Sequence, residues 1–499
     1  MSLLGLDVGT TGCKAVVFRP DGAVLATAYR EYPLLNPGRT QYELDPDLVW
    51  QHLRSCIQEV NAQVHDEPVM ALSISSQGEA VVPVSADRQV LANSPVSSDN
   101  RAVAQADELV SRLGFDRIYQ LTGQPASALF SLPKILWWRT NAPDVFEKAW
   151  KFLCYGDFVT LRLGLEPVID RTMAARTLAY DIHSQNWSDE ILDAAGLEAY
   201  QLAQVAPSGT VIGEIPAQQA QELGFVKPVQ VIVGGHDQPC AALGAGVINP
   251  GTVMYSIGTT EAIVAVLAEV RPDLQAGNIA VYPHVVPGTY VALAGNQTGG
   301  RLLRWYRDVL GMPERETARQ ESADVYDVIV RQVSERPSGL LLLPYFAGSG
   351  TLENDTTATG AIVGLTFDTR REDLVKAILE GITYEQALCL RFLEGRGVPV
   401  YRLHAVGGGA RSAIWLQLKS DIIGLPICQI RVTEAASLGA ALLAGWGSGL
   451  YSTVESGVER VVSVETTFTA CSDQTAYYRT RLDLYAQLYR QLKPVFAGL

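Results

Sequence analysis

The stretch Leu3 to Phe18 reads LLGLDVGTTGCKAVVF, and the stretch Val253 to Leu267 reads VMYSIGTTEAIVAVL. In each stretch an apolar run stops at Gly-Thr-Thr, and a second apolar run resumes within a few residues. Two apolar runs joined by a short glycine-containing turn are typical of a β-hairpin. Gly258 lies 249 residues after Gly9, which is about half of the 499-residue chain. This repeat predicts two similarly built domains, each opened by such a hairpin.

Strands and helices are mixed along the rest of the chain. The segments VQVIVGG (229–235) and LHAVGGG (403–409) are apolar runs that end in glycines and precede helix-like sequence. The helix expected after Gly409 should end at Gly424, just before Pro426. Its apolar face would consist of Ile414, Trp415, Leu418 and Ile422. The fold class is therefore α/β, with an N-terminal domain at 1–245 and a C-terminal domain at 246–499.

Two other patterns have helical spacing. Thr369 and Glu372 are spaced as a capping box, and they precede an apolar face formed by Leu374, Ile378 and Ile382. Near the end of the chain, apolar and aromatic side chains recur at helical spacing, at Tyr478, Leu482, Tyr485 and Tyr489. We interpret this second stripe as a packing face and not as a platform for stacking nucleic-acid bases.

Length and composition exclude several classes of protein. At 499 residues the chain is too long for one hydrophobic core. Its 39 basic and 53 acidic residues give a net charge of −14, without the basic surplus that binding to nucleic acid or an anionic membrane requires. Neither a secretory signal nor a membrane-spanning stretch is recognisable. The 7 scattered cysteines resemble neither a disulfide framework nor a zinc cluster. We therefore expect a cytoplasmic protein.

The Gly-Thr-Thr turns are candidate phosphate-binding elements. Their backbone N–H groups and hydroxyls can converge on phosphate oxygens. Asp7 precedes the first turn and Lys14 follows it, so this hairpin also offers a carboxylate for a metal ion and a cation. The alternative is that Gly-Thr-Thr is merely a turn, but two copies half a chain apart favour phosphate binding. Neither a Walker A loop nor a dinucleotide-binding glycine motif is present.

Asp237, in GGHDQPCAALGAG, is the candidate general base. It follows the expected strand at 229–233 and its two glycines, at the start of an expected helix, where ligands meet α/β sheets. A carboxylate there can accept the proton of a substrate hydroxyl. The alternative is a helix cap, a role that Asp fills well. We expect the neighbouring His236 to be a satisfied or exposed histidine and not a metal ligand.

Polar residues after two other segments are candidate hydroxyl ligands. Gln77 and Glu79 follow the apolar run at 69–74, and Asp99 and Arg101 lie in SSDNRA. An ordinary loop would also explain the first pair. A surface ion pair would also explain the second.

Taken together, these motifs resemble the FGGY family of carbohydrate kinases, within the actin, hexokinase and heat-shock ATPase superfold. The resemblance extends from LGLDVGTTGCK through GGHDQPCAALGAG and SIGTTEA to GGGARSAIWLQLKSDIIGLPI and EAASLGAALLAG. It implies two ribonuclease H-like domains flanking an active-site cleft. The first domain would bind mainly the sugar and the second mainly ATP. A homodimer is the oligomeric state that the family suggests.

The resemblance also implies roles for individual residues. Asp7 would help organise Mg²⁺, and Asp237 would be the general base. The phosphate and ATP ligands would be Thr10, Thr11, Lys14, Gly258, Thr259, Gly299, Gly300, Gly408 and Gly409. The sugar ligands would be Gln77, Glu79, Asp99, Asp237 and Gln238.

The substrate that the resemblance implies is a small sugar, foremost a pentulose as in xylulokinases. Glu79 and the pair Asp237 and Gln238 resemble glycerol kinases and favour a polyol, and a gluconokinase is a further alternative. Ala347 to Thr351 and Glu261 depart from the usual xylulokinase residues. A nucleotide-switched module like actin shares the superfold, but such a module does not need a hydroxyl base at Asp237.

Overall fold

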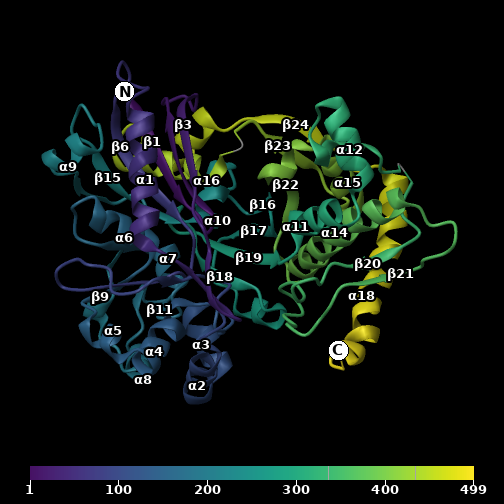
Figure 1. Cartoon of the computed structure of the whole chain (residues 1–499), viewed down its shortest axis with the longest axis horizontal. Coiled ribbons are helices and arrows are strands. Elements are labelled where there is room, and N and C mark those ends of the chain that lie inside the picture. The colour runs from purple at the N-terminus through teal and green to yellow at the C-terminus, as the bar shows by residue number, and fades with distance from the viewer. Residues whose placement is uncertain (335, 433, 499) are drawn as a thin grey trace.

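The computed structural model describes residues 1–334, 336–432 and 434–498. Each half of the chain is built around one large β-sheet (Figure 1). The six-stranded N-terminal sheet has the order β14-β15-β6-β1-β2-β3. Its strands are β1 (Ser2–Val8), β2 (Gly12–Phe18), β3 (Val24–Glu31), β6 (Val69–Ser76), β14 (Val211–Glu214) and β15 (Gln230–His236).

The seven-stranded C-terminal sheet has the order β18-β19-β17-β16-β22-β23-β24. Its strands are β16 (Gly251–Ile257), β17 (Glu261–Leu267), β18 (Ala280–Pro283), β19 (Tyr290–Asn296), β22 (Val400–Val406), β23 (Ile427–Ile430) and β24 (Val464–Phe468). Short strands form the smaller sheets: β4 (Leu35–Gly38), β5 (Gln41–Leu44), β7 (Val82–Val84), β8 (Ser94–Pro95), β9 (Lys151–Leu153), β10 (Val168–Asp170), β11 (Tyr180–Asp181), β12 (Asn186–Trp187), β13 (Gln204–Ala206), β20 (Leu341–Leu343) and β21 (Ala361–Val363).

The two large sheets repeat one arrangement of strands. An antiparallel hairpin, β1–β2 or β16–β17, continues into a further antiparallel strand, β3 or β19. On the other side of the hairpin lie two parallel strands, β6 and β15 in the first sheet and β22 and β23 in the second. The repeat predicted from the two Gly-Thr-Thr stretches is therefore confirmed as two equivalent hairpins. The exact domain boundary at 245/246 stays a prediction.

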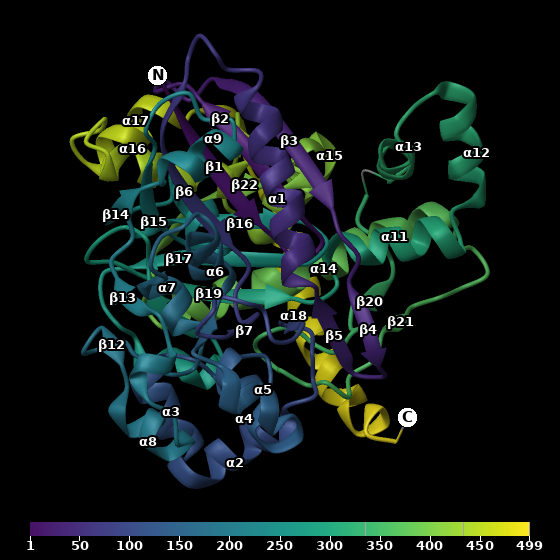
Figure 2. The ribbon, with the colours of Figure 1, turned by 60° about the vertical axis from the view of Figure 1, so that its left-hand side comes forward.

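Helices cover both sheets. In the N-terminal half they are α1 (Pro46–Asn61), α2 (Val103–Leu113), α3 (Phe115–Thr122), α4 (Ser131–Asn141), α5 (Pro143–Lys148), α6 (Tyr155–Arg162), α7 (Arg171–Ala175), α8 (Asp189–Ala195), α9 (Ala217–Glu222) and α10 (Asp237–Gly244). In the C-terminal half they are α11 (Gly299–Val309), α12 (Met312–Glu321), α13 (Val325–Arg331), α14 (Arg371–Gly395), α15 (Ala413–Ile423), α16 (Ala435–Gly447), α17 (Val454–Val461) and α18 (Ser472–Phe496). Figure 2 shows α12 and α13 projecting from the body of the molecule.

Helix α16 joins the two halves of the molecule. Although it comes late in the chain, it packs on β1 and β6 of the N-terminal sheet and on α10 (Figure 1). Glycines allow this contact to be made backbone to backbone. A Cβ atom added at Gly439 would lie 1.8 Å from the carbonyl oxygen of Cys240, and one at Gly244 would lie 1.9 Å from that of Ala435. The sequence EAASLGAALLAG therefore forms an interface between the halves.

Most of the helical predictions are confirmed, with two corrections. The helix after Gly409 spans Ala413–Ile423 and ends at Gly424 in a left-handed conformation, but Ile414 is exposed and not part of the buried face. The capping box at Thr369 and Glu372 is wrong by one residue. At the start of α14 the carboxylate of Asp373 accepts from the backbone N–H of Arg370 over 2.9 Å, and the Thr369 hydroxyl accepts from the N–H of Thr366 instead.

The tyrosine stripe near the C-terminus is a packing face, as predicted. Tyr478, Leu482, Tyr485 and Tyr489 are all buried. Two of the tyrosine hydroxyls donate hydrogen bonds to buried carboxylates of α14: Tyr478 donates to Glu380, and Tyr485 donates to Glu385. All seven cysteines lie in the described ranges and are free thiols. Within those same ranges, no helix has the length and apolar character needed to cross a membrane.

Candidate active site

The first Gly-Thr-Thr turn, residues 9–11, is braced by Gln77. The N–H of Gly9 donates to the Gly12 carbonyl over 3.0 Å and closes the turn. The Thr10 hydroxyl donates to Oε1 of Gln77 over 2.8 Å, and Nε2 of Gln77 donates to the Gly9 carbonyl over 3.2 Å. Gln77 was predicted as a sugar ligand, and that role stays a prediction, because its amide here supports the turn. Thr11, the last residue of the turn, is exposed.

Asp7 and Lys14 lie opposite each other on β1 and β2. The Ser75 hydroxyl donates to Oδ1 of Asp7 over 3.0 Å. Burial raises the pKa of Asp7 to about 6, against the lowering effects of the Ser75 hydrogen bond and Lys14. A carboxylate with free lone pairs is the kind of ligand that Mg²⁺ prefers, so Asp7 fits the predicted metal site. The Lys14 ammonium forms an ion pair with Glu434, next to α16.

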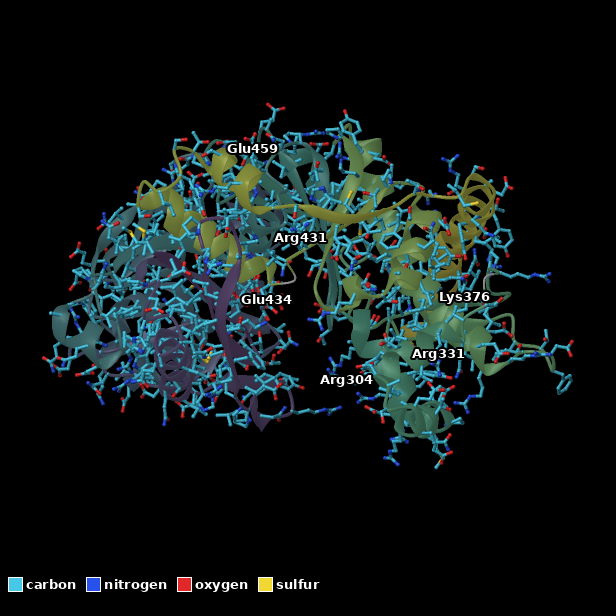
Figure 3. All side chains as sticks on the ribbon, turned by 90° about the horizontal axis from the view of Figure 1, so that it is seen from above. Arg304, Arg331, Lys376, Arg431, Glu434 and Glu459 are labelled. Atoms are coloured by element: carbon cyan, nitrogen blue, oxygen red, sulfur yellow. The ribbon has the colours of Figure 1, made fainter. Side chains whose placement is uncertain are left out.

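Figure 3 shows where the Lys14 partner lies in the molecule. Glu434 lies at the edge of the N-terminal half, and Arg304, on α11, lies at the facing edge of the C-terminal half. The side chains of Lys14 and Glu434 are 24% and 30% exposed, so solvent and ligands can reach the pair. Glu434 was not among the sequence predictions, because it lies 420 residues from Lys14.

Asp237 is the first residue of α10 and directly follows β15. Its Oδ1 atom lies 3.1 Å from Nε2 of His236, whose Nδ1 lies 3.0 Å from the Tyr282 hydroxyl. Burial, and secondly Arg176, lower the pKa of His236 well below its usual value, so the ring is neutral. A neutral ring that accepts the Tyr282 hydroxyl at Nδ1 donates its Nε2–H to Asp237. His236 is therefore a satisfied histidine, as expected.

The electrostatic surroundings of Asp237 suit a general base. Its side chain is 31% exposed and so remains accessible to a substrate. Burial, then the charges of Asp7 and Glu79, raise its pKa to about 7. A base works best when its pKa lies near the working pH. The Oε1 atom of the neighbouring Gln238 is buried and has no hydrogen-bond partner among the described residues.

Glu79 is held by a buried arginine that sequence reasoning missed. Glu79 has a left-handed backbone, with φ of 65°, and its carboxylate accepts from Nε of Arg176 over 2.5 Å. The guanidinium carbon of Arg176 lies 5.0 Å from the centre of the Phe130 ring and 5.5 Å from that of Tyr282. Its Nη1 donates to Oε1 of Gln124 over 2.7 Å. These residues come from distant segments, and no local pattern marks them.

Asp99 is fully buried and its oxygens are occupied. They accept from the guanidinium of Arg101, from the N–H of Arg101, and from the N–H of Tyr42 over 2.7 Å. Asp99 and Arg101 therefore form an ion pair, as the alternative interpretation predicted, but the pair is buried and not on the surface. Sugar binding by Asp99 stays a prediction.

The predicted nucleotide-binding glycines lie around the second turn, residues 258–260. The N–H of Gly300 donates to the Gly258 carbonyl over 2.8 Å, and the N–H of Arg301 donates to the Thr259 carbonyl over 3.0 Å. The start of α11 is thus fastened to this turn. A Cβ atom added at Gly409 would lie 2.3 Å from the Ile257 side chain, so the 407–409 turn packs there as well. The Thr259 side chain and Gly408 are exposed.

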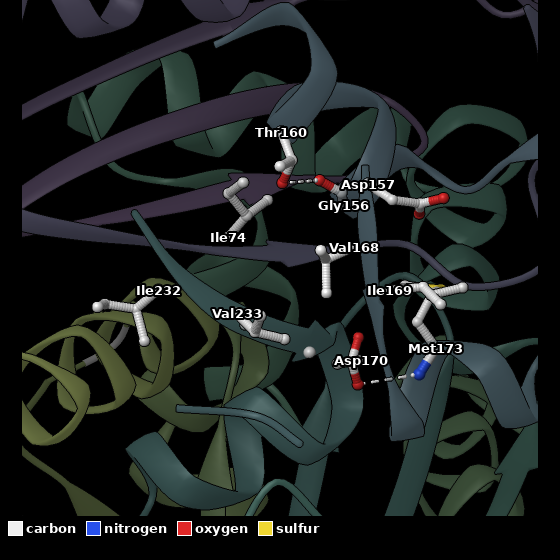
Figure 4. A pocket seen from close by; sticks show the side chains of 12 residues that line it. Ile74, Gly156, Asp157, Thr160, Val168, Ile169, Asp170, Met173, Ile232 and Val233 are labelled. Carbon is white, nitrogen blue, oxygen red and sulfur yellow. Dashed lines mark hydrogen bonds between the residues drawn. The ribbon is translucent and has the colours of Figure 1, made fainter. Parts of the chain in front are cut away.

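A small cavity lies beneath the strand that leads to Asp237 (Figure 4). It has room for about one water molecule, which is too little for a sugar. Asp170, on its wall, accepts from the N–H of Met173 and from the Thr172 hydroxyl, which in turn accepts from the N–H of His236. The cavity wall therefore fixes the backbone next to Asp237.

Comparisons with known proteins agree with this geometry. The family model described as the FGGY family of carbohydrate kinases, N-terminal domain, matches residues 2–244, and the corresponding C-terminal domain model matches residues 253–448. The xylulose kinase of Bacillus subtilis is 27% identical over 499 residues, covering 100% of this chain and 98% of that protein. The autoinducer-2 kinase of Klebsiella pneumoniae is 30% identical over 511 residues, covering 100% and 95%.

A solved structure extends the likeness to three dimensions. The ligand-bound xylulose kinase from Lactobacillus acidophilus superposes with a TM-score of 0.91 at 25% identity, covering 100% of this chain and 99% of that chain. The mixed α/β architecture with two domains therefore matches the actin/hexokinase-like fold of these kinases. Because the two family models span most of its length, the chain belongs to the FGGY family of carbohydrate kinases.

Proposed function

We propose that this sugar kinase transfers the γ-phosphoryl group of ATP to a hydroxyl of a small neutral sugar, foremost a pentulose. The observation that carries the proposal is Asp237, an accessible carboxylate directly after β15 whose pKa is raised to about 7. It would accept the proton of the attacking hydroxyl. The likeness to xylulose kinases supports a pentulose, and the alternatives are a polyol and gluconate.

Asp7 would hold Mg²⁺, and the two Gly-Thr-Thr turns would hold the phosphates of ATP. A bound Mg²⁺ supplies positive charge that neutralises the phosphate oxygens. These oxygens can accept hydrogen bonds from the exposed side chains of Thr11 and Thr259. They can also approach the backbone at the exposed Gly408. Lys14 would add its charge from the first hairpin, and Glu434 would keep its ammonium in place. Exclusion of water would protect ATP from hydrolysis.

The charges around Asp237 support a neutral acceptor. Arg176 is a buried cation of this region, and Glu79 already neutralises it. The ammonium of Lys134 is also buried, but it donates to the backbone carbonyls of Leu129 and Glu79. Asp237 and Asp7 add negative charge, and the charge of Asp7 is one of the causes that raise the pKa of Asp237. An aldonic acid would therefore bring its carboxylate next to like charges.

We expect wild-type enzyme to prefer neutral acceptors by about 100-fold or more in kcat/KM over an aldonic acid, because like charges repel. The measurement is coupled ADP release over ketopentoses, polyols and aldonic acids. Preference for the aldonic acid would overturn the charge argument and favour a gluconokinase. Absence of acceptor-stimulated turnover across the panel would overturn the kinase proposal and favour a nucleotide-switched module.

Activity should also depend on pH. As pH falls through about 7, Asp237 gains a proton and can no longer accept one, so kcat/KM for the acceptor should fall about tenfold per unit. Glu79→Gln removes one of the charges that raise the pKa of Asp237, and the midpoint should move to lower pH. The measurement is the pH profile of both enzymes, with Glu166→Gln, at an exposed carboxylate, as control. An unchanged midpoint in Glu79→Gln would contradict this coupling.

A further inference from the structure

A fully buried ion pair lies behind the second Gly-Thr-Thr turn. Glu261 is the first residue of β17, directly after Thr260, and Lys419 lies on α15. Nζ of Lys419 is 2.9 Å from both carboxylate oxygens of Glu261, and both side chains are 0% exposed. Such a pair must overcome a large desolvation cost, and an apolar pair of similar volume is often as stable or more so. The pair therefore calls for an explanation other than stability.

The pair is completed by polar and aromatic neighbours. The Tyr255 hydroxyl donates to Oε2 of Glu261 over 2.6 Å, and Lys419 donates to the Tyr255 oxygen over 2.7 Å and to the Thr383 hydroxyl over 3.4 Å. The ammonium also lies 4.5 Å from the ring centres of both Tyr255 and Trp415. Every hydrogen of the ammonium therefore has a nearby acceptor, and the geometry of the pair is tightly defined.

The pair connects the glycine segments that surround the second turn. A Cβ atom added at Gly299 would lie 2.7 Å from Cγ of Glu261, so α11 begins directly against this side chain. The backbone carbonyl of Glu261 accepts from Nε2 of Gln386 on α14, over 3.3 Å. Through Lys419 the same residue is fastened to α15, which follows the 407–409 glycine turn. One buried contact thus links the 258–260 turn, the start of α11 and α15.

We propose that Glu261 and Lys419 are positioning residues that keep three glycine segments correctly placed around the phosphates of ATP. These segments are the 258–260 turn, Gly299 and Gly300 at the start of α11, and the 407–409 turn that precedes α15. The proposal rests on the function proposed above, in which those segments bind the nucleotide. Both side chains are buried, so neither can contact a ligand. They therefore act by fixing the position of the neighbouring backbone. Their loss should therefore affect nucleotide binding much more than binding of the acceptor.

The test compares Glu261→Met, Lys419→Met and the double variant. Each single variant leaves one buried charge without its partner and should melt at a lower temperature than the wild type. The double variant removes both charges and roughly keeps the volume, so it should regain most of the lost melting temperature. We expect its KM for ATP to stay at least about tenfold above wild type, with the acceptor KM within about twofold. Titration calorimetry with MgATP should show the same loss of affinity.

A double variant with wild-type affinity for MgATP would overturn the proposal and leave the pair a structural feature only. The control is Glu314→Met with Arg371→Met, an ion pair of the same half in which Arg371 also donates to Tyr306 and Leu310, at the opposite end of α11 from its glycines. Should the double Met variant not fold, Tyr255→Phe removes one hydroxyl from the pair, and a KM for ATP about threefold higher is expected. An unchanged KM there would also count against the proposal. Calorimetry does not require turnover, so it separates this proposal from the proposed reaction.

Discussion

Replacing Asp237 by Asn should reduce kcat for phosphorylation of the acceptor by about 10³-fold or more, while the affinity for ATP stays within about threefold of wild type. General bases contribute about 10² to 10⁴-fold to rates, and an amide cannot accept the hydroxyl proton. The substitution nearly preserves the shape of the side chain, and the Asn oxygen can still accept from Nε2 of His236. Loss of turnover would therefore report on the chemistry and not on the fold.

The measurement is coupled ADP release at saturating acceptor, together with MgATP titration by calorimetry. The matched control is Asp189→Asn, because Asp189 is the first residue of α8 as Asp237 is of α10. If Asp237 only stabilised the start of its helix, both substitutions would lower the melting temperature slightly and leave kcat unchanged. Residual turnover above about 10% of wild type in Asp237→Asn would refute the assignment as general base.

Local sequence predicted those parts of the site that lie on short, continuous stretches. The two hairpins were predictable because each is a pair of apolar runs interrupted by Gly-Thr-Thr. Asp237 was predictable for the same reason, since it follows an apolar run that ends in glycines. Local spacing was also the source of the error at Thr369, because the carboxylate that accepts a backbone N–H at this end of the helix is Asp373, one residue after Glu372.

Residues that act through distant partners could not be predicted in this way. Arg176 reaches Glu79, which is 97 residues away, and Gln124, which is 52 residues away. Lys14 was recognised as a cation near phosphate, but its partner Glu434 is brought to it only by the packing of α16 on the first sheet. Glu261 was visible only as an unusual residue after the second turn, and its pairing with Lys419 depends on α15. Each of these contacts is decided by the tertiary fold.

A substitution in the contact between α16 and α10, Gly439→Ala, should have a second large effect, on the melting temperature. In an isolated helix Gly→Ala is stabilising by about 1 kcal/mol, so propensity alone predicts a more stable Gly439→Ala variant. In this fold the added Cβ atom would lie 1.8 Å from the Cys240 carbonyl oxygen, a backbone atom that cannot turn aside. Helices α10 and α16 would have to separate. Because overpacking of this kind costs about 3 kcal/mol or more, we expect the melting temperature to fall by roughly 5–10 °C.

Differential scanning calorimetry of Gly439→Ala and of Gly395→Ala gives the comparison. Gly395 is also a helical glycine, the last residue of α14, but a Cβ atom added there meets nothing within 4 Å. Gly395→Ala should therefore melt at or slightly above the wild-type temperature, with the opposite sign to Gly439→Ala. The same separation would move Glu434, at the start of α16, away from Lys14 and so raise the KM for ATP in Gly439→Ala. A Gly439→Ala enzyme that melts like the wild type would mean that α10 and α16 do not meet backbone to backbone.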